Sequence, residues 1–384
     1  MPFLSGRVTF TRTQVSGSSP GIFGPKELER LEKFAAGKQR LPASDRVDIG
    51  WTAGNHVLDT RFDLAKNIVN ESLLFSMRVD TQKIPADLKA AYFQIELDGA
   101  TAANSGVKPS ARQKKEARDA AHDRLNKEAR DGRYLKRKLV PVLWDARSNE
   151  LLAGTTSSTA LEQLHGLFER TFERSFEPMT AGKRAFDLAE LRQQIRAVDD
   201  SSPSAFVPGA TPNEIAWIPQ EDSRDFLGNE FLLWLWYVLD VESDSIKLSD
   251  QSEAVVMLAR TLTLECPRGQ TGLETIRSEV PTKLPEARRA IQAGKWPRKT
   301  GITLVRHDEQ YDLTLQAETL AVNSAKLQVP DEDNERARHE GRIDQIRQLI
   351  ETLDLVYDAF GRRRCSHDWS KELAKMQKWM AQVK

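Results

Sequence analysis

One stretch of the chain matches the G-x-S-x-G pattern that carries the nucleophilic serine of many hydrolases, Gly17-Ser18-Ser19-Pro20-Gly21. In that arrangement the backbone N–H of the residue after the serine helps to hold the developing oxyanion. Here that residue is Pro20, which has no N–H to donate. The match also lies in a loop-like segment near the N-terminus, so we interpret it as chance.

Two other groups of residues could bind a metal ion. Cys365 and His367 could supply two ligands, but no second pair stands nearby, and a free thiol with a surface histidine at a helix start is favoured. The carboxylates of residues 330–335 could bind a divalent cation, although a solvated loop that caps the next helix is favoured. The chain has no P-loop, G-x-G-x-x-G or H-E-x-x-H motif. The sequence therefore predicts no enzyme and no metal or other cofactor.

The strongest pattern is one of charge. The chain has 56 Lys and Arg against 56 Asp and Glu, and a net charge of zero argues against a nucleic-acid binder. The charges are not evenly spread, however. Residues 105–138 hold twelve basic and five acidic residues, residues 277–299 hold seven and two, and residues 219–253 hold two and nine. Two stretches of the chain are therefore strongly basic, and the excess of acidic residues lies in the rest of the chain.

Such stretches allow two interpretations. Lysine and arginine can neutralise the phosphates of a polyanion and release its counterions, which gives affinity without sequence readout. Alternatively, the first stretch is a solvated helix face, because Glu116, Asp119, Asp123 and Glu128 could form intrahelical pairs with its bases. Charge alone leaves both interpretations open.

The elements that must position these residues can be predicted from periodicity and turn signals. A helix is expected from Pro25 to Gly37, and another from Pro85, interrupted at 100–110, to about Arg130. A hairpin around 145–149 and a capping box at Thr159–Glu162 are also expected. Strands are predicted at 7–15, 48–51, 73–79, 139–144, 150–155, 254–265, 301–306, 311–315 and 320–328. This order predicts an α+β fold with antiparallel sheets and flanking helices.

The second half contains an apolar run at 231–239, too short for a membrane span. We interpret its Trp234, Trp236 and Tyr237 as core residues. A charged helix is predicted at 285–293. Two further helices are predicted after these elements, one at 333–360 with Gly361 as its C-terminal cap and one at 366–382.

These signals divide the chain into four parts. An N-terminal α+β domain spans 1–196 and contains the basic stretch 105–138 and the hairpin 139–155. A linker at 197–225 leads to a second α+β domain at 226–330 with the basic helix 285–299, followed by C-terminal helices at 331–384. Two cysteines and no visible signal peptide suit a reducing cytoplasm.

Three stretches, in this order and spacing, resemble the recombination-associated protein RdgC family. The first is Ala111-Arg-Gln-Lys-Lys-Glu-Ala-Arg118, which leads through Tyr134-Leu-Lys-Arg-Lys138 into the hairpin. The second is Phe226-Leu-Gly-Asn-Glu-Phe-Leu-Leu-Trp-Leu-Trp-Tyr237. The third is Pro285-Glu-Ala-Arg-Arg-Ala-Ile-Gln-Ala-Gly-Lys295 with Lys299 and the Lys326-Leu327 strand. The resemblance spans roughly residues 2–330, and the helices after Pro330 are an addition to it.

The resemblance implies a ring-forming or horseshoe homodimer that binds DNA with little sequence preference, double-stranded DNA especially. It implies a nucleoid-associated protein that modulates recombination or replication by restraining the RecA recombinase through shared DNA. It also implies that no cofactor is needed and no reaction is catalysed. Two alternatives remain open: a metal-dependent nuclease, and a protein-interaction scaffold whose basic helices meet an acidic partner.

The expected DNA contacts neutralise phosphates rather than read bases. They fall into two sets. The first basic group is Arg112, Lys114, Lys115, Arg118, Lys136, Arg137 and Lys138. The second basic group is Lys283, Arg288, Arg289, Lys295, Arg298 and Lys299.

Overall fold

The computed structural model describes residues 2–38, 47–103, 108–207, 215–269 and 272–382. Within these residues thirteen strands form one antiparallel sheet with the order β10-β9-β11-β12-β13-β1-β6-β5-β4-β2. Three short strands pair outside this path, β3 with β4, β7 with β1 and β8 with β9. The strands are β1 (Val8–Val15), β2 (Val47–Thr52), β3 (Ile68–Val69), β4 (Ser72–Gln82), β5 (Leu135–Asp145), β6 (Glu150–Ala153), β7 (Phe176–Pro178), β8 (Ser245–Lys247), β9 (Glu253–Glu265), β10 (Glu274–Ser278), β11 (Trp296–Arg306), β12 (Glu309–Gln316) and β13 (Val322–Lys326).

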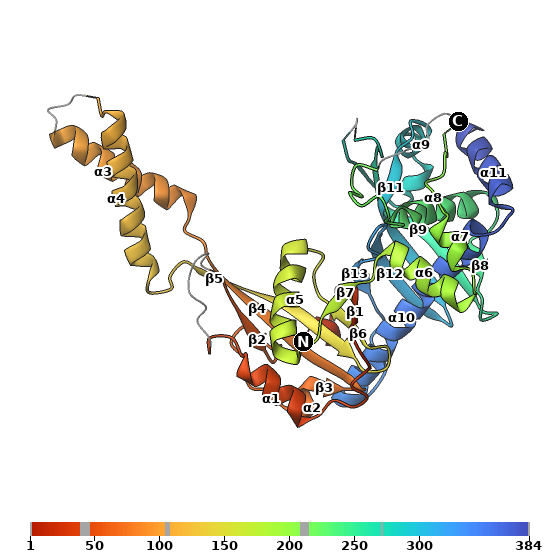
Figure 1. Cartoon of the computed structure of the whole chain (residues 1–384), viewed down its shortest axis with the longest axis horizontal. Helices are drawn as coiled ribbons and strands as arrows, with labels where there is room; N and C mark the ends of the chain where they lie inside the picture. The colour runs from red at the N-terminus through yellow and green to blue at the C-terminus, as the bar shows by residue number, and fades with distance from the viewer. Residues whose placement is uncertain (1, 39–46, 104–107, 208–214, 270–271, 383–384) are drawn as a thin grey trace.

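Helices cover this sheet on both faces and project from one end of it (Figure 1). The α-helices are α1 (Pro25–Lys33), α2 (Leu64–Asn67), α3 (Ala86–Ala103), α4 (Ala111–Ala129), α5 (Ser158–Phe172), α6 (Ala181–Leu191), α7 (Ile195–Asp199), α8 (Phe226–Val241), α9 (Pro285–Gln292), α10 (Glu335–Arg364) and α11 (Trp369–Gln382). Two 3-10 turns, η1 (Pro2–Leu4) and η2 (Pro281–Lys283), complete the described elements. The predicted α+β class with antiparallel pairing is confirmed.

The N-terminal part of the sheet is buried on both faces. Successive strand residues point to opposite sides, so neighbours on one strand enter different core clusters. On β4, Leu73 and Phe75 join one buried cluster with residues of α1 and α5. Leu74, between them, belongs to the other cluster, together with Ile343 and Ile346 of α10. The strand is therefore buried without a break from Ser72 to Asp80, which matches the predicted buried strand at 73–79.

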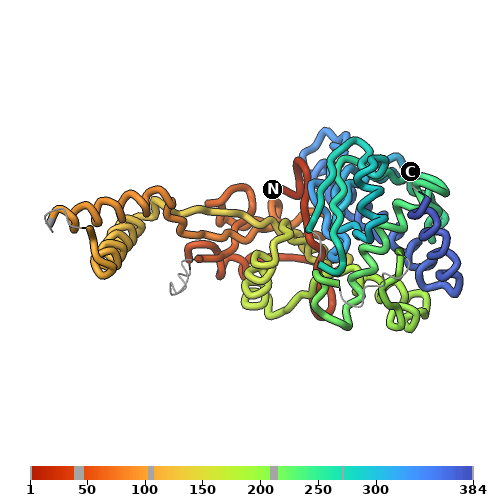
Figure 2. Tube along the Cα trace, turned by 90° about the horizontal axis from the view of Figure 1, so that it is seen from above, coloured from red at the N-terminus to blue at the C-terminus, as the bar shows by residue number. Residues whose placement is uncertain are grey.

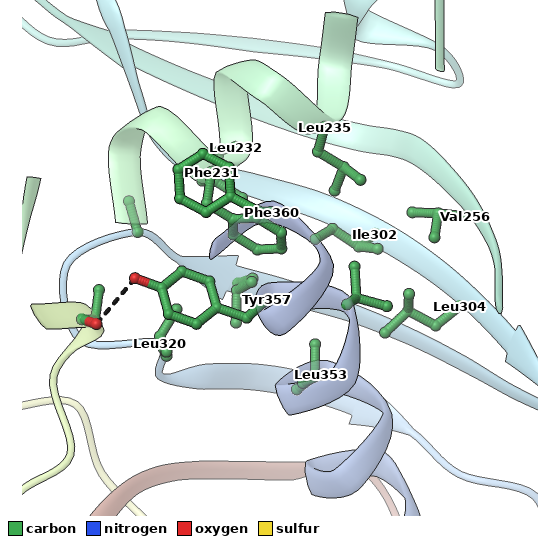
Figure 3. Close-up of a cluster of buried hydrophobic side chains, with 14 of the residues drawn as sticks. Phe231, Leu232, Leu235, Val256, Ile302, Leu304, Leu320, Leu353, Tyr357 and Phe360 are labelled. Atoms are coloured by element: carbon green, nitrogen blue, oxygen red, sulfur yellow. Dashed lines mark hydrogen bonds between the residues drawn. The ribbon is translucent and has the colours of Figure 1, made fainter. Parts of the chain in front are cut away.

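The C-terminal part of the sheet packs on α8, whose residues from Phe226 to Val238 are buried around the whole helix. Figure 3 shows Phe231 of α8 grouped with Tyr357 and Phe360 of α10, beside the strand residues Ile302 and Leu304. The ring centroids of Phe231 and Tyr357 lie 5.1 Å apart, edge to face. The Tyr357 hydroxyl donates to the carbonyl of Ala181 at 2.9 Å, so this buried polar group is satisfied. The apolar run is core, as predicted, and so are its aromatic residues.

Strand β1 joins the two parts. Its first residues pair with β13, with Val8 opposite Ala325, and its later residues pair with β6, with Thr11 opposite Ala153. The hydrogen-bonded sheet therefore passes from the predicted N-terminal domain into the predicted second domain without a break. Val198 and Phe206, within the predicted linker, are buried in the larger core cluster. The four-part division stays a prediction. The structure adds that the predicted parts share one sheet and one core cluster.

Two predicted helix boundaries are wrong. The capping box at Thr159–Glu162 does not form, because α5 already begins at Ser158 and Thr159 is its second residue. Gly361 does not end α10, which continues to Arg364 and is capped at Cys365. Arg192 lies beside Gly361 and pairs with Asp358 of α10.

Candidate nucleic-acid interface

The first basic group is carried by the start of β5 and by a helical projection, residues 83–103 and 108–134, that stands away from the sheet at one end of the molecule (Figures 1 and 2). Helices α3 and α4 pack against each other, and α4 buries the stripe Ala117, Ala121, Leu125 and Ala129. This i, i+4 spacing of mostly alanine places small side chains on one face, which allows close packing of the two helices. The remaining α4 surface is left to charged residues.

At the base of the projection one carboxylate ties three segments together. Glu128 of α4 accepts a hydrogen bond from the hydroxyl of Tyr92 of α3 at 2.5 Å and from that of Tyr134 at 2.9 Å. These hydrogen bonds, the one from Tyr92 foremost, lower the pKa of Glu128. The guanidinium of Arg124 lies 4.3 Å from the centre of the Tyr92 ring. The projection is therefore held in a defined orientation on β4 and β5.

The basic side chains of α4 are exposed, but they are not equivalent. Arg112 pairs with Glu116 one turn later at 2.9 Å, and this contact raises the pKa of Arg112. Arg118 lies 5.7 Å from the ring of Phe93 on α3. Lys114 and Lys115 have no ion pair to any described residue. The predicted intrahelical pairing accounts for Arg112, and it leaves both lysines available to a ligand.

The three consecutive basic residues on β5, Lys136 to Lys138, point alternately to the two faces of the sheet because the strand is pleated. Arg137 lies opposite Asp80 of β4 and its Nε is 3.6 Å from that carboxylate. Lys136 and Lys138 point to the other face and are exposed, with no ion pair among the described residues. Among the described residues, the cations of the first basic group without an ion pair are therefore Lys114, Lys115, Arg118, Lys136 and Lys138, of which Arg118 also contacts a ring.

Half of the second basic group is already neutralised by the protein itself. Lys295 bonds Glu274 at 2.9 Å, and its side chain is only 15% exposed. Arg298 pairs with both Glu265 and Glu318 and lies 4.3 Å from the ring of Trp217. Arg288 lies 3.4 Å from Asp240. In this group the exposed cations without an ion pair in the described structure are Lys283, Arg289 and Lys299.

The two basic groups lie at opposite ends of one chain, the first on the projection and the second around α9 (Figures 1 and 2). A single chain therefore does not combine them in one continuous patch. The sequence analysis also missed cations that the fold brings to the second group. Lys375 and Lys378 of α11 line the same cleft as Lys283 and Arg288, and their i, i+3 spacing on a helix is the signal that could have revealed them.

A second charged cleft, of about 730 Å³, lies where α6 and α10 meet β1 and β5. Its centre is Arg12, which bonds Glu150 through two nitrogens and Asp354 through two. Burial alone would lower the pKa of Arg12, but Asp354 and Glu150 outweigh it and raise that pKa. Arg347 likewise holds Asp145 at 2.9 Å. These acids are committed to arginines, so the cleft presents paired charges rather than free ligands.

The residues that the sequence offered as a nucleophile or as metal ligands make contacts typical of loops and helix ends. The Ser19 hydroxyl donates to the carbonyl of Ala146 and accepts from the N–H of Gly21. Cys365 is a free thiol whose pKa is raised by burial, and His367 is exposed beside Asp368. Asn334 caps α10, as expected of a loop at this place. In the part of the chain that the structure describes, no three His, Cys, Asp or Glu side chains are grouped to hold a metal ion.

No described helix is both long enough and apolar enough to cross a bilayer. Comparison with protein-family models and with curated proteins finds no match to this chain.

Proposed function

We propose that this protein binds DNA without reading its sequence, through phosphate contacts made by the first basic group. The observation that carries the proposal is the set of exposed lysines without ion pairs on and beside the projection: Lys114, Lys115, Lys136 and Lys138. On the same helix Arg112 is already paired with Glu116 at 2.9 Å. A cation with no partner on a protruding element is instead available to a phosphate.

The resemblance to the RdgC family supplies the finer form of the proposal. In that form two copies make a homodimer, duplex is preferred to single strands, and the protein acts in the cytoplasm at the nucleoid. Its effect on recombination or replication comes from restraining RecA on the shared DNA. The residues act by charge and position, without a cofactor and without catalysis.

The first test is fluorescence anisotropy of a labelled duplex of about 30 base pairs and of its single strand, between about 50 and 200 mM salt. We expect log affinity to fall with log salt at a slope of about −4 or steeper, with little dependence on sequence. In Lys114→Glu/Lys115→Glu the slope should become shallower by about 2, because about 0.9 counterions are released per phosphate contact.

A matched control is Lys26→Glu/Lys33→Glu on α1, which makes the same change in net charge at exposed residues away from the projection. Its slope should stay near that of the unchanged protein. Equal losses in both double variants would show that net charge alone matters and would overturn the assignment of the site. Failure to bind any DNA at low salt would overturn the proposal and favour an acidic protein partner. Loss of full-length duplex only when Mg²⁺ is added would favour the nuclease.

A further inference from the structure

The second basic group borders a cleft of about 800 Å³ between η2, the end of α8, α9 and α11. We refer to it as the α11 cleft. A volume of this order is within the range of ligand sites, about 300–1,000 Å³. Its lining consists of Tyr237, Val241, Lys283, Arg288, Lys375, Lys378, Trp379 and Gln382. Among the described residues, the wall of the cleft therefore has four cationic residues and no carboxylate.

Little inside the protein compensates these charges. Arg288 lies 3.4 Å from Asp240, which is not itself a lining residue. Lys283, Lys375 and Lys378 are exposed, and none has an ion pair within the described ranges. Lys283 is about ninety positions from the two α11 lysines in sequence, so only the fold brings them together. Like charges gathered around one space repel one another, and an anion in that space relieves the repulsion.

The walls of the cleft are fixed by packing. Trp379 of α11 is buried, with its ring 5.6 Å from that of Tyr237 on α8, edge to face. Its Nε1 donates to Asp240 at 2.8 Å, and the same carboxylate faces Arg288 of α9. The side chain of Gln292 on α9 donates to the carbonyl of Met380 at 3.0 Å. Three helices are thus tied together around the cationic space, which makes the arrangement of charges a property of the fold.

The chemistry of the lining favours phosphate over an acidic peptide. Lysine ammonium groups are donors only, and on flexible stems they meet phosphate oxygens as point charges. A peptide is normally anchored by an apolar side chain in a pocket. The aromatic rings here are buried in contacts with other rings, and the exposed apolar side chain of the described lining is the small Val241. Along one strand of DNA a phosphate recurs about every 3.4 Å of helix axis, so adjacent phosphates could engage several of these cations.

We propose that the α11 cleft binds adjacent phosphate groups of a nucleic-acid strand, and that Lys375 and Lys378 extend the second basic group. The inference builds on the proposed DNA binding and assigns a role to the C-terminal helix, which lies outside the family resemblance. Polyphosphate free in solution has the same chemistry, so the experiment separates the two sources.

The cleft itself is tested with inorganic tripolyphosphate and the full chain by isothermal titration calorimetry. We expect binding that weakens at least several-fold in Lys375→Glu and in Lys378→Glu. The control is Lys371→Glu on the same helix, because Lys371 is 79% exposed, pairs with Asp368 at 2.7 Å and does not line the cleft. All three residues are exposed, so folding should be retained, which circular dichroism checks. Equal weakening in the control, or no binding by the unchanged protein, would overturn the site.

The source is tested by duplex binding across the same salt range. Each cleft variant should make the salt slope shallower by about 1, while Lys371→Glu leaves it unchanged. If the projection variants weaken DNA binding and the cleft variants do not, the inference fails and the proposed function stands. If the protein binds tripolyphosphate through these lysines but no DNA, the proposed function fails and the ligand is a free polyphosphate.

Discussion

At the scale of single residues, Glu128 holds the segments of the projection together. This carboxylate accepts hydrogen bonds from the hydroxyls of Tyr92 and Tyr134. It therefore connects α3, α4 and the residue that precedes β5. Its lowered pKa means that the folded protein prefers the ionised form more strongly than the unfolded chain does. The stabilisation is complete above the usual carboxyl pKa of 4.5 and is lost as pH falls through the lowered value.

We therefore expect Glu128→Gln to loosen the projection at about pH 7, and the difference from the unchanged protein to shrink as pH falls through the lowered pKa of Glu128 and the native carboxyl becomes protonated. Hydrogen exchange of α3 and α4, compared with that of β4, measures the effect. The control is Glu116→Gln, which removes an exposed carboxylate from the same helix. Equal exchange of the projection in Glu128→Gln and the unchanged protein at neutral pH would contradict the role of this residue.

The residue scale also shows where sequence reasoning about the site stops. The spacing of basic residues identified the projection, and the structure leaves Lys114 and Lys115 exposed there. The same spacing could not distinguish Lys295 or Arg298 from a free cation. The partners of these residues, Glu274 on β10 and Glu265 on β9, come close only through strand pairing. A charge count sees a residue's type, whereas its availability depends on contacts between distant segments.

At the scale of elements, α8 is the helix on which the C-terminal half is assembled. Its Gly228 lies against the loop after β12, where an added Cβ would stand 1.9 Å from the carbonyl oxygen of Ala317. Backbone atoms on the far side leave no flexible group to move aside. Glycine is needed here for close approach rather than for its backbone angles.

Gly228→Ala should therefore destabilise the protein by about 1–3 kcal/mol or more, as overpacking does. The matched control is Gly166→Ala in α5, where an added Cβ meets nothing within 4 Å. That change should be neutral or stabilising by up to about 1 kcal/mol, because alanine is the better helix former. Urea denaturation followed by tryptophan fluorescence compares the two. A stable Gly228→Ala variant would show that the helix can shift.

Most elements could be predicted because their patterns are long. The strand at 254–265 alternates, and the two helices of the projection are separated by an evident break. Helix α6 could not be predicted in this way. Its buried face includes Ala181, Ala185 and Ala189, small residues with a weak hydrophobic signal. Strands such as β3, with two residues, are too short to show a period at all.

At the scale of the whole molecule, α10 ties the two parts of the sheet together. Its N-terminal half packs near β3 and η1, and its C-terminal half packs on α6 and α8. Midway along it, Asp354 accepts from Arg12 of β1 at 2.6 Å and from Arg184 of α6 at 2.7 Å. Arg12 is only 2% exposed. Asp354, together with Glu150 of β6, therefore compensates a buried cation at the junction.

Asp354→Ala should cost about 3–5 kcal/mol of stability, because it leaves a buried charge with fewer partners. Glu351→Ala is the control one turn earlier on the same helix. Glu351 is 59% exposed and lies 3.5 Å from Arg306, so its loss should cost less than about 1 kcal/mol. Urea denaturation measures both variants. A small effect of Asp354→Ala would mean that Glu150 alone satisfies Arg12.

The position of β1 also has a consequence for folding during synthesis of the chain. Strand β1 is synthesised well before β13, the strand that covers one of its edges, because the two are separated by 317 residues, as the hydrogen bond from Arg7 to Ser324 shows. At about 5–20 residues per second, translation needs roughly 15–60 s to supply it. During that time the edge of β1 has unpaired N–H and C=O groups that a neighbouring nascent chain could bind. The element that unites the finished molecule is thus also the one most in need of protection on the ribosome.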